Sequence, residues 1–96
     1  MKIKILESAM QDLEIGFKFY ERQEADLGSY FLDSLFSDID SLQVCGGIHR
    51  TFFGKHRALS KRFPFALYYT ATDGVVQIHA VIDCRQNPRR ISRKLK

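Results

Sequence analysis

Residues 65–82 decide the fold, and they read FALYYTATDGVVQIHAVI. Apolar and more polar side chains alternate along both halves of this stretch, which is the period of a β-strand with two different faces. Asp73-Gly74 lies between the halves and favours a two-residue turn, because glycine adopts a positive φ without strain. We therefore predict a β-hairpin. On its second strand we expect one wholly apolar face, formed by Val76, Ile78, Ala80 and Ile82.

Toward the N-terminus the apolar spacing changes to three and four residues, which predicts two amphipathic helices. Ser8 followed by Gln11 matches a capping box and places the start of the first helix at Ser8. Cys45-Gly46-Gly47 ends the second helix, since glycine is favoured just beyond a helix. Residues 8–44 are expected to form an antiparallel helical hairpin with a solvated acidic outer face.

Shorter segments complete the expected fold. Lys2–Leu6 alternates like a half-buried strand, and His56–Lys61 supplies another. Asn87-Pro88 could start one short helix, or the tail could stay loose. The predicted class is α+β: an N-terminal strand, an antiparallel helical hairpin, then a three-stranded antiparallel meander, with the helices packed on one face of the sheet. The 96 residues are expected to form a single domain, residues 1–96.

Charge is divided unevenly along the chain. Residues 1–44 carry four bases and nine acids, whereas residues 45–96 carry eleven bases and two acids. The second half therefore predicts a basic surface, suited to an acidic partner or to nucleic acid. No apolar run approaches the roughly 20 residues that span a bilayer, so no membrane association is expected. The first residues do not match a signal peptide, and two isolated cysteines favour free thiols in a cytoplasmic protein.

Two stretches of the chain are distinctive: Arg62-Phe63-Pro64-Phe65 running into Leu67-Tyr68-Tyr69, and the segment from Ala80 to Pro88. In this order they resemble the RelE/ParE superfamily, the toxins of bacterial type II toxin–antitoxin modules, also called plasmid stabilization proteins. The resemblance covers nearly the whole chain. It implies a cytoplasmic toxin that is neutralised by a cognate antitoxin, with which it forms a hetero-oligomer. RelE-like members cleave mRNA in the ribosome, and ParE-like members poison DNA gyrase.

The resemblance also supplies candidate catalytic residues: Arg57, Lys61 and Arg85. Cleavage of RNA requires a 2′-hydroxyl to be activated and the phosphate charge to be stabilised by nearby cations. Leu59 and Ala66 stand where further bases are expected, so the ribonuclease set is depleted. This favours the ParE-like branch and a non-enzymatic toxin. The alternatives are a metal-independent, ribosome-dependent mRNA endoribonuclease and a non-toxic binding module. No cofactor and no metal site are expected.

Strand parity assigns a target-binding surface to the sheet face opposite the helices. By this reasoning His79, Asp83 and Arg85 share that face; the full predicted set is Arg57, Arg62, Tyr68, His79 and Arg85. Two plainer readings stay open: Arg85 pairs with Asp83, and His79 is an ordinary half-buried strand residue. For the antitoxin we expect contacts on the helical hairpin at Phe19, Tyr20 and Phe36. The alternative is that these aromatic side chains pack inside the chain.

Overall fold

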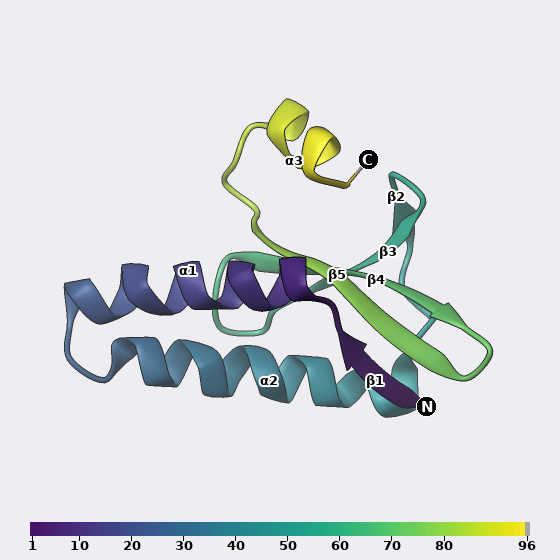
Figure 1. Ribbon diagram of the computed structural model, residues 1–96, viewed down its shortest axis with the longest axis horizontal. Coiled ribbons are helices and arrows are strands. Elements are labelled where there is room, and N and C mark those ends of the chain that lie inside the picture. The colour runs from purple at the N-terminus through teal and green to yellow at the C-terminus, as the bar shows by residue number, and fades with distance from the viewer. Residues whose placement is uncertain (96) are drawn as a thin grey trace.

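The computed structural model describes residues 1–95. Along the chain the elements are β1 (Lys2–Ile5), α1 (Glu7–Gln23), α2 (Leu27–Cys45), β2 (Thr51–Phe52), β3 (Lys55–Leu59), β4 (Phe65–Thr72), β5 (Val75–Asp83) and α3 (Pro88–Leu95). The long helices α1 and α2 run side by side along one side of the sheet, and α3 stands on the other side (Figure 1). The predicted α+β class and helical hairpin are confirmed.

The strands form one mixed sheet in the order β1-β5-β4-β3-β2. Strands β3, β4 and β5 are antiparallel neighbours, as the predicted meander requires, and their hairpin turns at Asp73 and Gly74, which both have positive φ. The prediction was incomplete at both edges. β2 adds a short antiparallel strand beside β3, and β1 joins the sheet parallel to β5. The tail, whose form was left open, is helical from Pro88.

Close contact between α1 and α2 depends on two glycines. A Cβ atom on Gly16 would lie 2.5 Å from the ring of Phe31, and one on Gly28 would lie 2.7 Å from the carbonyl oxygen of Phe17. The space thus left is filled by an aromatic cluster in which the ring of Tyr20 lies 5.1 Å from that of Phe31. The core between hairpin and sheet is therefore aromatic and tightly packed.

The first helix begins differently from the prediction. It starts at Glu7 rather than Ser8, directly after Leu6 donates its N–H to the carbonyl of Ile78. The Ser8 hydroxyl does not cap the helix; it donates to the carbonyl oxygen of His79 at 2.7 Å. β1 has ended at this point, so side chains of α1 take over hydrogen bonding to the open edge of β5. The capping-box prediction was wrong because this edge competes for the same hydroxyl.

β5 contains a bulge that reverses its side-chain alternation. Tyr68 pairs with Ala80 and Tyr69 pairs with Ile78, so His79 is an extra residue without a partner on β4. Consequently Ile78 packs toward α1 and α2, whereas Ala80 packs on the other side of the sheet. The prediction of one wholly apolar face on this strand was therefore wrong. Val76, Ile78 and Val81 belong to the core beneath the helical hairpin, and Ala80 and Ile82 belong to a second core.

This second core lies beneath α3. Ile91 and Leu95 are the buried residues of that helix, and they pack on Ala66, Tyr68, Ala80 and Ile82 of the sheet. Both faces of the central strands are thus covered, one by the helical hairpin and one by α3 (Figure 1). Any functional surface on the α3 side must include α3 itself.

Candidate partner-binding surface

Tyr68 shows that the sheet face opposite the hairpin is not open. Its side chain lies on the predicted face, but only 3% of the residue is exposed because Ile91 and Leu95 of α3 cover it. The expectation of an exposed aromatic residue for target binding is wrong. The reason is the short amphipathic tail helix, whose two apolar residues are enough to close the centre of this face.

Arg57 does lie on the α3 side, where it is half-buried beside its cross-strand neighbour Tyr68. Its guanidinium carbon is 5.4 Å from the centre of the Phe52 ring, and one of its nitrogens is 3.7 Å from the sulfur of Cys84. These contacts hold the guanidinium against the protein, so Arg57 is positioned at the margin of the face that α3 covers.

His79 occupies the bulge of β5 and is half-buried. Its Nε2 atom is 3.0 Å from the hydroxyl of Thr70. Burial, together with the nearby charge of Lys55, lowers the pKa of the imidazole. At neutral pH this side chain is therefore uncharged and already has a hydrogen-bonding partner, which agrees with the reading of an ordinary half-buried strand residue.

Arg85 lies on the opposite side of the sheet from its predicted place. Its Nε and Nη2 atoms donate to the two carboxylate oxygens of Asp83 at 2.9 and 2.6 Å, so the pairing alternative is the one observed. Hydrogen bonds from Arg85 hold the pKa of Asp83 below its usual value. Asp83 pairs across the strands with Phe65, a residue of the core beneath the hairpin, so both charged groups lie on the α1 side. The bulge at His79 causes this reversal.

Lys61 and Arg62 are exposed in the connection between β3 and β4. This connection is held by a buried carboxylate of α2: Asp38 accepts a 2.6 Å hydrogen bond from the Ser60 hydroxyl and a longer one from the Lys61 N–H. Asp38 is only 8% exposed, so the expectation of a solvated acidic face fails at this residue. The two cations themselves extend into solvent.

The three candidate catalytic residues are consequently in three different settings. Arg57 is half-buried on the α3 side, Lys61 is exposed in a loop, and Arg85 is paired with Asp83 on the α1 side. A phosphodiester cannot touch cations on both sides of a sheet at once. The structure therefore does not assemble them into one catalytic cluster.

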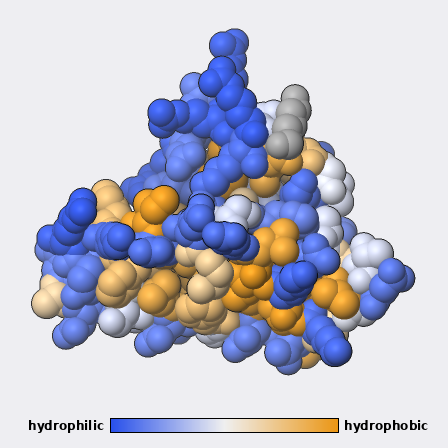
Figure 2. All heavy atoms as spheres, viewed as in Figure 1, coloured by the Kyte–Doolittle hydropathy of each residue, from blue (hydrophilic) through white to orange (hydrophobic). Residues whose placement is uncertain are grey.

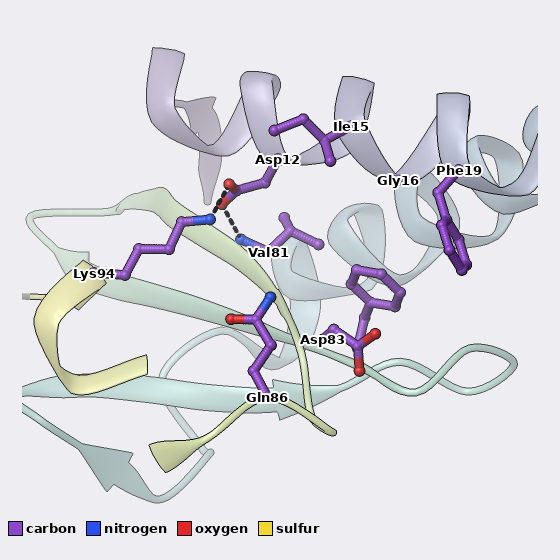
Figure 3. A pocket seen from close by; sticks show the side chains of 9 residues that line it. Asp12, Ile15, Gly16, Phe19, Val81, Asp83, Gln86 and Lys94 are labelled. Atoms are coloured by element: carbon purple, nitrogen blue, oxygen red, sulfur yellow. Dashed lines mark hydrogen bonds and ion pairs between the residues drawn. The ribbon is translucent and has the colours of Figure 1, made fainter. Parts of the chain in front are cut away.

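A hollow of about 260 Å³ opens between α1, the end of β5 and α3 (Figure 3). Its lining is mostly apolar: Ile15, Gly16, Phe19, Phe65 and Val81, with Asp12, Asp83, Gln86 and Lys94 at its polar positions. Asp12 is nearly buried; one carboxylate oxygen accepts the N–H of Val81 at 2.9 Å, and the other forms an ion pair with Lys94. This ion pair ties α3 to α1 across one end of the hollow.

The three residues predicted to meet an antitoxin are placed quite differently from one another. Phe19 is 51% exposed and lines the hollow. Tyr20, one residue later, is only 8% exposed and packs in the aromatic core, as the alternative reading held. Phe36 is half-buried and lines a separate shallow groove between α1 and α2, together with Met10 and Leu32. Phe19 is thus the most accessible of the three.

A basic surface adjoins the hollow. It is formed by the turn after β5 and by the outward side of α3, and its cations are Arg85, Arg89, Arg90 and Arg93. Within residues 1–95, Arg89, Arg90 and Arg93 form no ion pair. In Figure 2 hydrophilic side chains cover the outward side of α3, and hydrophobic ones are visible among them over α1. We call this cluster the arginine surface.

Sequence reasoning missed a polar cluster around Tyr69, which is completely buried. Its hydroxyl accepts the N–H of Gly47 at 2.9 Å and lies 2.5 Å from Nδ1 of His49, while the ring of His56 stacks on its own ring. Burial raises the pKa of the Tyr69 hydroxyl. These two histidines thus bind the loop before β2 to the sheet, a role that their sequence spacing did not reveal.

The described part of the chain contains no group of three or more metal-ligating side chains. Likewise, no helix within residues 1–95 has the length and apolar character needed to cross a membrane.

Comparison with known proteins gives a likeness to solved structures. No family model matches this chain, and no curated protein does. A chain of the solved structure described as the chromosomal ParDE TA system from P. aeruginosa superposes with a TM-score of 0.70. The match covers 86% of this chain and 95% of that chain at 18% sequence identity. The predicted RelE/ParE-like fold is therefore confirmed as a fold.

Proposed function

We propose that this protein is the cytoplasmic toxin of a bacterial type II toxin–antitoxin module, held in a hetero-oligomer by a cognate antitoxin. The observation that carries the proposal is the fold match with a ParDE chain, which extends over 86% of this chain. Folds host many functions, so the assignment also rests on the motif resemblance at Arg62–Tyr69 and Ala80–Pro88.

Within that class we propose a ParE-like toxin that acts on a protein target such as DNA gyrase. Separation of the basic side chains supports this branch: Arg57 and Arg85 lie on opposite sides of the sheet. Two further positions point the same way. Leu59 is 61% exposed but apolar, and Ala66 is buried under α3, so neither supplies a cation to a phosphate. Stabilising the charge of RNA cleavage needs several cations at one point.

Controlled expression without an antitoxin tests the proposal. We expect growth arrest, loss of supercoiling by purified gyrase when the purified protein is added, and no cleavage of mRNA on ribosomes. Cleavage at codon boundaries with intact supercoiling would refute the ParE-like assignment in favour of the RelE-like endonuclease. Normal growth at high expression would refute the toxin assignment and favour a non-toxic binding module.

Co-expression tests the antitoxin part separately. We expect a short reading frame to adjoin this gene, and its product to restore growth and to co-purify with the protein. Growth arrest that persists when that frame is expressed would contradict its assignment as the antitoxin.

A further inference from the structure

The hollow between α1 and α3 has the size and lining of a site for one or two side chains. At about 260 Å³ it is smaller than the roughly 300–1,000 Å³ typical of small-molecule sites. Phe65 and Val81 are almost completely buried and form its floor, while Ile15 and Phe19 remain 66% and 51% exposed at its rim. Exposed apolar side chains around an apolar hollow mark a place where a partner buries an anchor residue.

The charges beside the hollow indicate the chemistry of that partner. Both carboxylates in its lining are already compensated, Asp12 by Lys94 and Asp83 by Arg85. Gln86 lines the hollow and also the arginine surface, so the two are contiguous. Residues 85–96 contain no acid, which leaves the arginine surface with an uncompensated positive charge. A ligand that bridges both regions must therefore combine an apolar group with negative charge.

We propose that the hollow and the arginine surface together bind an acidic protein segment that inserts one aliphatic or aromatic side chain between α1 and α3. The anchor contacts Ile15, Phe19 and Val81, and carboxylates of the segment lie against Arg89 and Arg93. This inference rests on the proposed function, since the antitoxin is the partner expected to carry the segment. It places the contact on one side of the hairpin, away from the groove that contains Phe36.

A protein segment fits this surface better than nucleic acid does. Binding of single strands uses successive aromatic side chains on which bases stack. Here Phe19 is the exposed aromatic residue of the lining, and Tyr68, the aromatic residue expected on the sheet, is buried. The remaining apolar contacts come from Ile15, Val81 and the buried ring of Phe65, and they suit an aliphatic or aromatic side chain.

The test uses the purified full chain and a random dodecapeptide phage library, followed by synthetic peptides of the enriched sequences. We expect enriched peptides to be rich in Asp and Glu around one Leu, Ile or Phe. Ile15→Asp places a charge at the rim of the hollow and should weaken peptide binding at least about tenfold, as loss of a central anchor does. Arg89→Ala with Arg93→Ala should weaken it about fivefold at low salt and less at high salt.

Matched variants separate a local effect from general damage. Val44 is 94% exposed at the end of α2, and Arg22 is exposed at the end of α1. Val44→Asp and Arg22→Ala therefore make the same kinds of substitution, apolar to acidic and arginine to alanine, away from the proposed site. Both variants should bind the peptides with a dissociation constant within about twofold of that of the unmodified protein. Amide resonances of Ile15, Phe19 and Gln86 should shift on titration.

Three outcomes would overturn the proposal. They are failure to enrich any peptide, enriched peptides without acids or without an apolar anchor, and binding that Ile15→Asp leaves unchanged. A 12-nucleotide single-stranded RNA that binds more tightly than the peptides, and shifts the same resonances, would overturn it as well. Growth arrest by the protein is measured independently, so a failed binding test leaves the toxin assignment standing, and a non-toxic protein leaves this site standing.

Discussion

Asp12 connects α1 to both β5 and α3, because one of its carboxylate oxygens accepts the N–H of Val81 and the other pairs with Lys94. Asp12→Ala is therefore the most informative single change. The substitution leaves the N–H of Val81 without its 2.9 Å acceptor in a buried position, which costs about 1–3 kcal/mol. It also breaks the ion pair with Lys94. Because the Lys94 side chain is 40% exposed, that loss adds no more than about 1 kcal/mol.

The expected total is a decrease of about 3 kcal/mol in the free energy of unfolding. For a domain of this size, 1 kcal/mol corresponds to about 4–8 °C in Tm, so the midpoint should fall by about 12–24 °C. Urea denaturation followed by far-ultraviolet circular dichroism measures the free energy. Hydrogen exchange by NMR measures the protection of the Val81 amide, which should drop beyond the global change.

Asp12→Asn is the matched control. The amide keeps an oxygen that can accept the Val81 N–H but cannot pair ionically with Lys94, so we expect a loss of only about 1 kcal/mol. A double-mutant cycle with Lys94→Met isolates the ion pair. If Asp12→Ala unfolds within about 0.5 kcal/mol of the unmodified protein, or no differently from Asp12→Asn, the role assigned to the Val81 hydrogen bond is refuted.

Three further changes test other parts of the fold. Gly28→Ala should lower the free energy of unfolding, measured by urea denaturation, by about 1–2 kcal/mol, because the clash with the Phe17 carbonyl exceeds the gain in helix propensity. The control Ser37→Ala, on the exposed side of α2, should not lower it. Tyr69→Phe removes a buried acceptor and should cost about 1–3 kcal/mol; an unchanged midpoint would contradict this. The pKa of His79 is lowered in the folded state, so the unfolded chain binds the proton first and stability falls as the pH drops below about 6.5. His79→Gln should flatten this dependence between about pH 7 and 5, and an identical slope would refute it.

The sequence pattern within a single segment was sufficient to predict the elements whose conformation depends mainly on neighbouring residues. Asp73-Gly74 predicted the hairpin correctly because these two residues by themselves favour the positive φ angles of the turn. The apolar residues at helical spacing from Leu27 to Leu42 likewise predicted α2, since the periodicity of a helix can be read within one segment. Both predictions required no knowledge of what packs against the element.

The candidate site was harder to predict because it depends on contacts between distant residues. Asp12 and Asp38 are spaced like surface acids, and only the open edge of β5 and the loop at Ser60 make them buried acceptors. The alternation along β4 places Tyr68 on the sheet face opposite the helical hairpin, and this face is covered only because Leu95 of α3 packs on it. None of these three partners can be identified from a pattern inside one segment.

The surplus residue at His79 has a consequence for how such chains diverge. Without His79, Ala80 would follow Ile78 directly, and the residues from Ala80 to Asp83 would keep their partners on β4 and their faces. The ladder would become regular, and Arg85 would stay on the α1 side. Aligning this protein with a related one that lacks the bulge therefore requires a gap at His79, because an ungapped alignment would equate residues from opposite surfaces along the rest of β5.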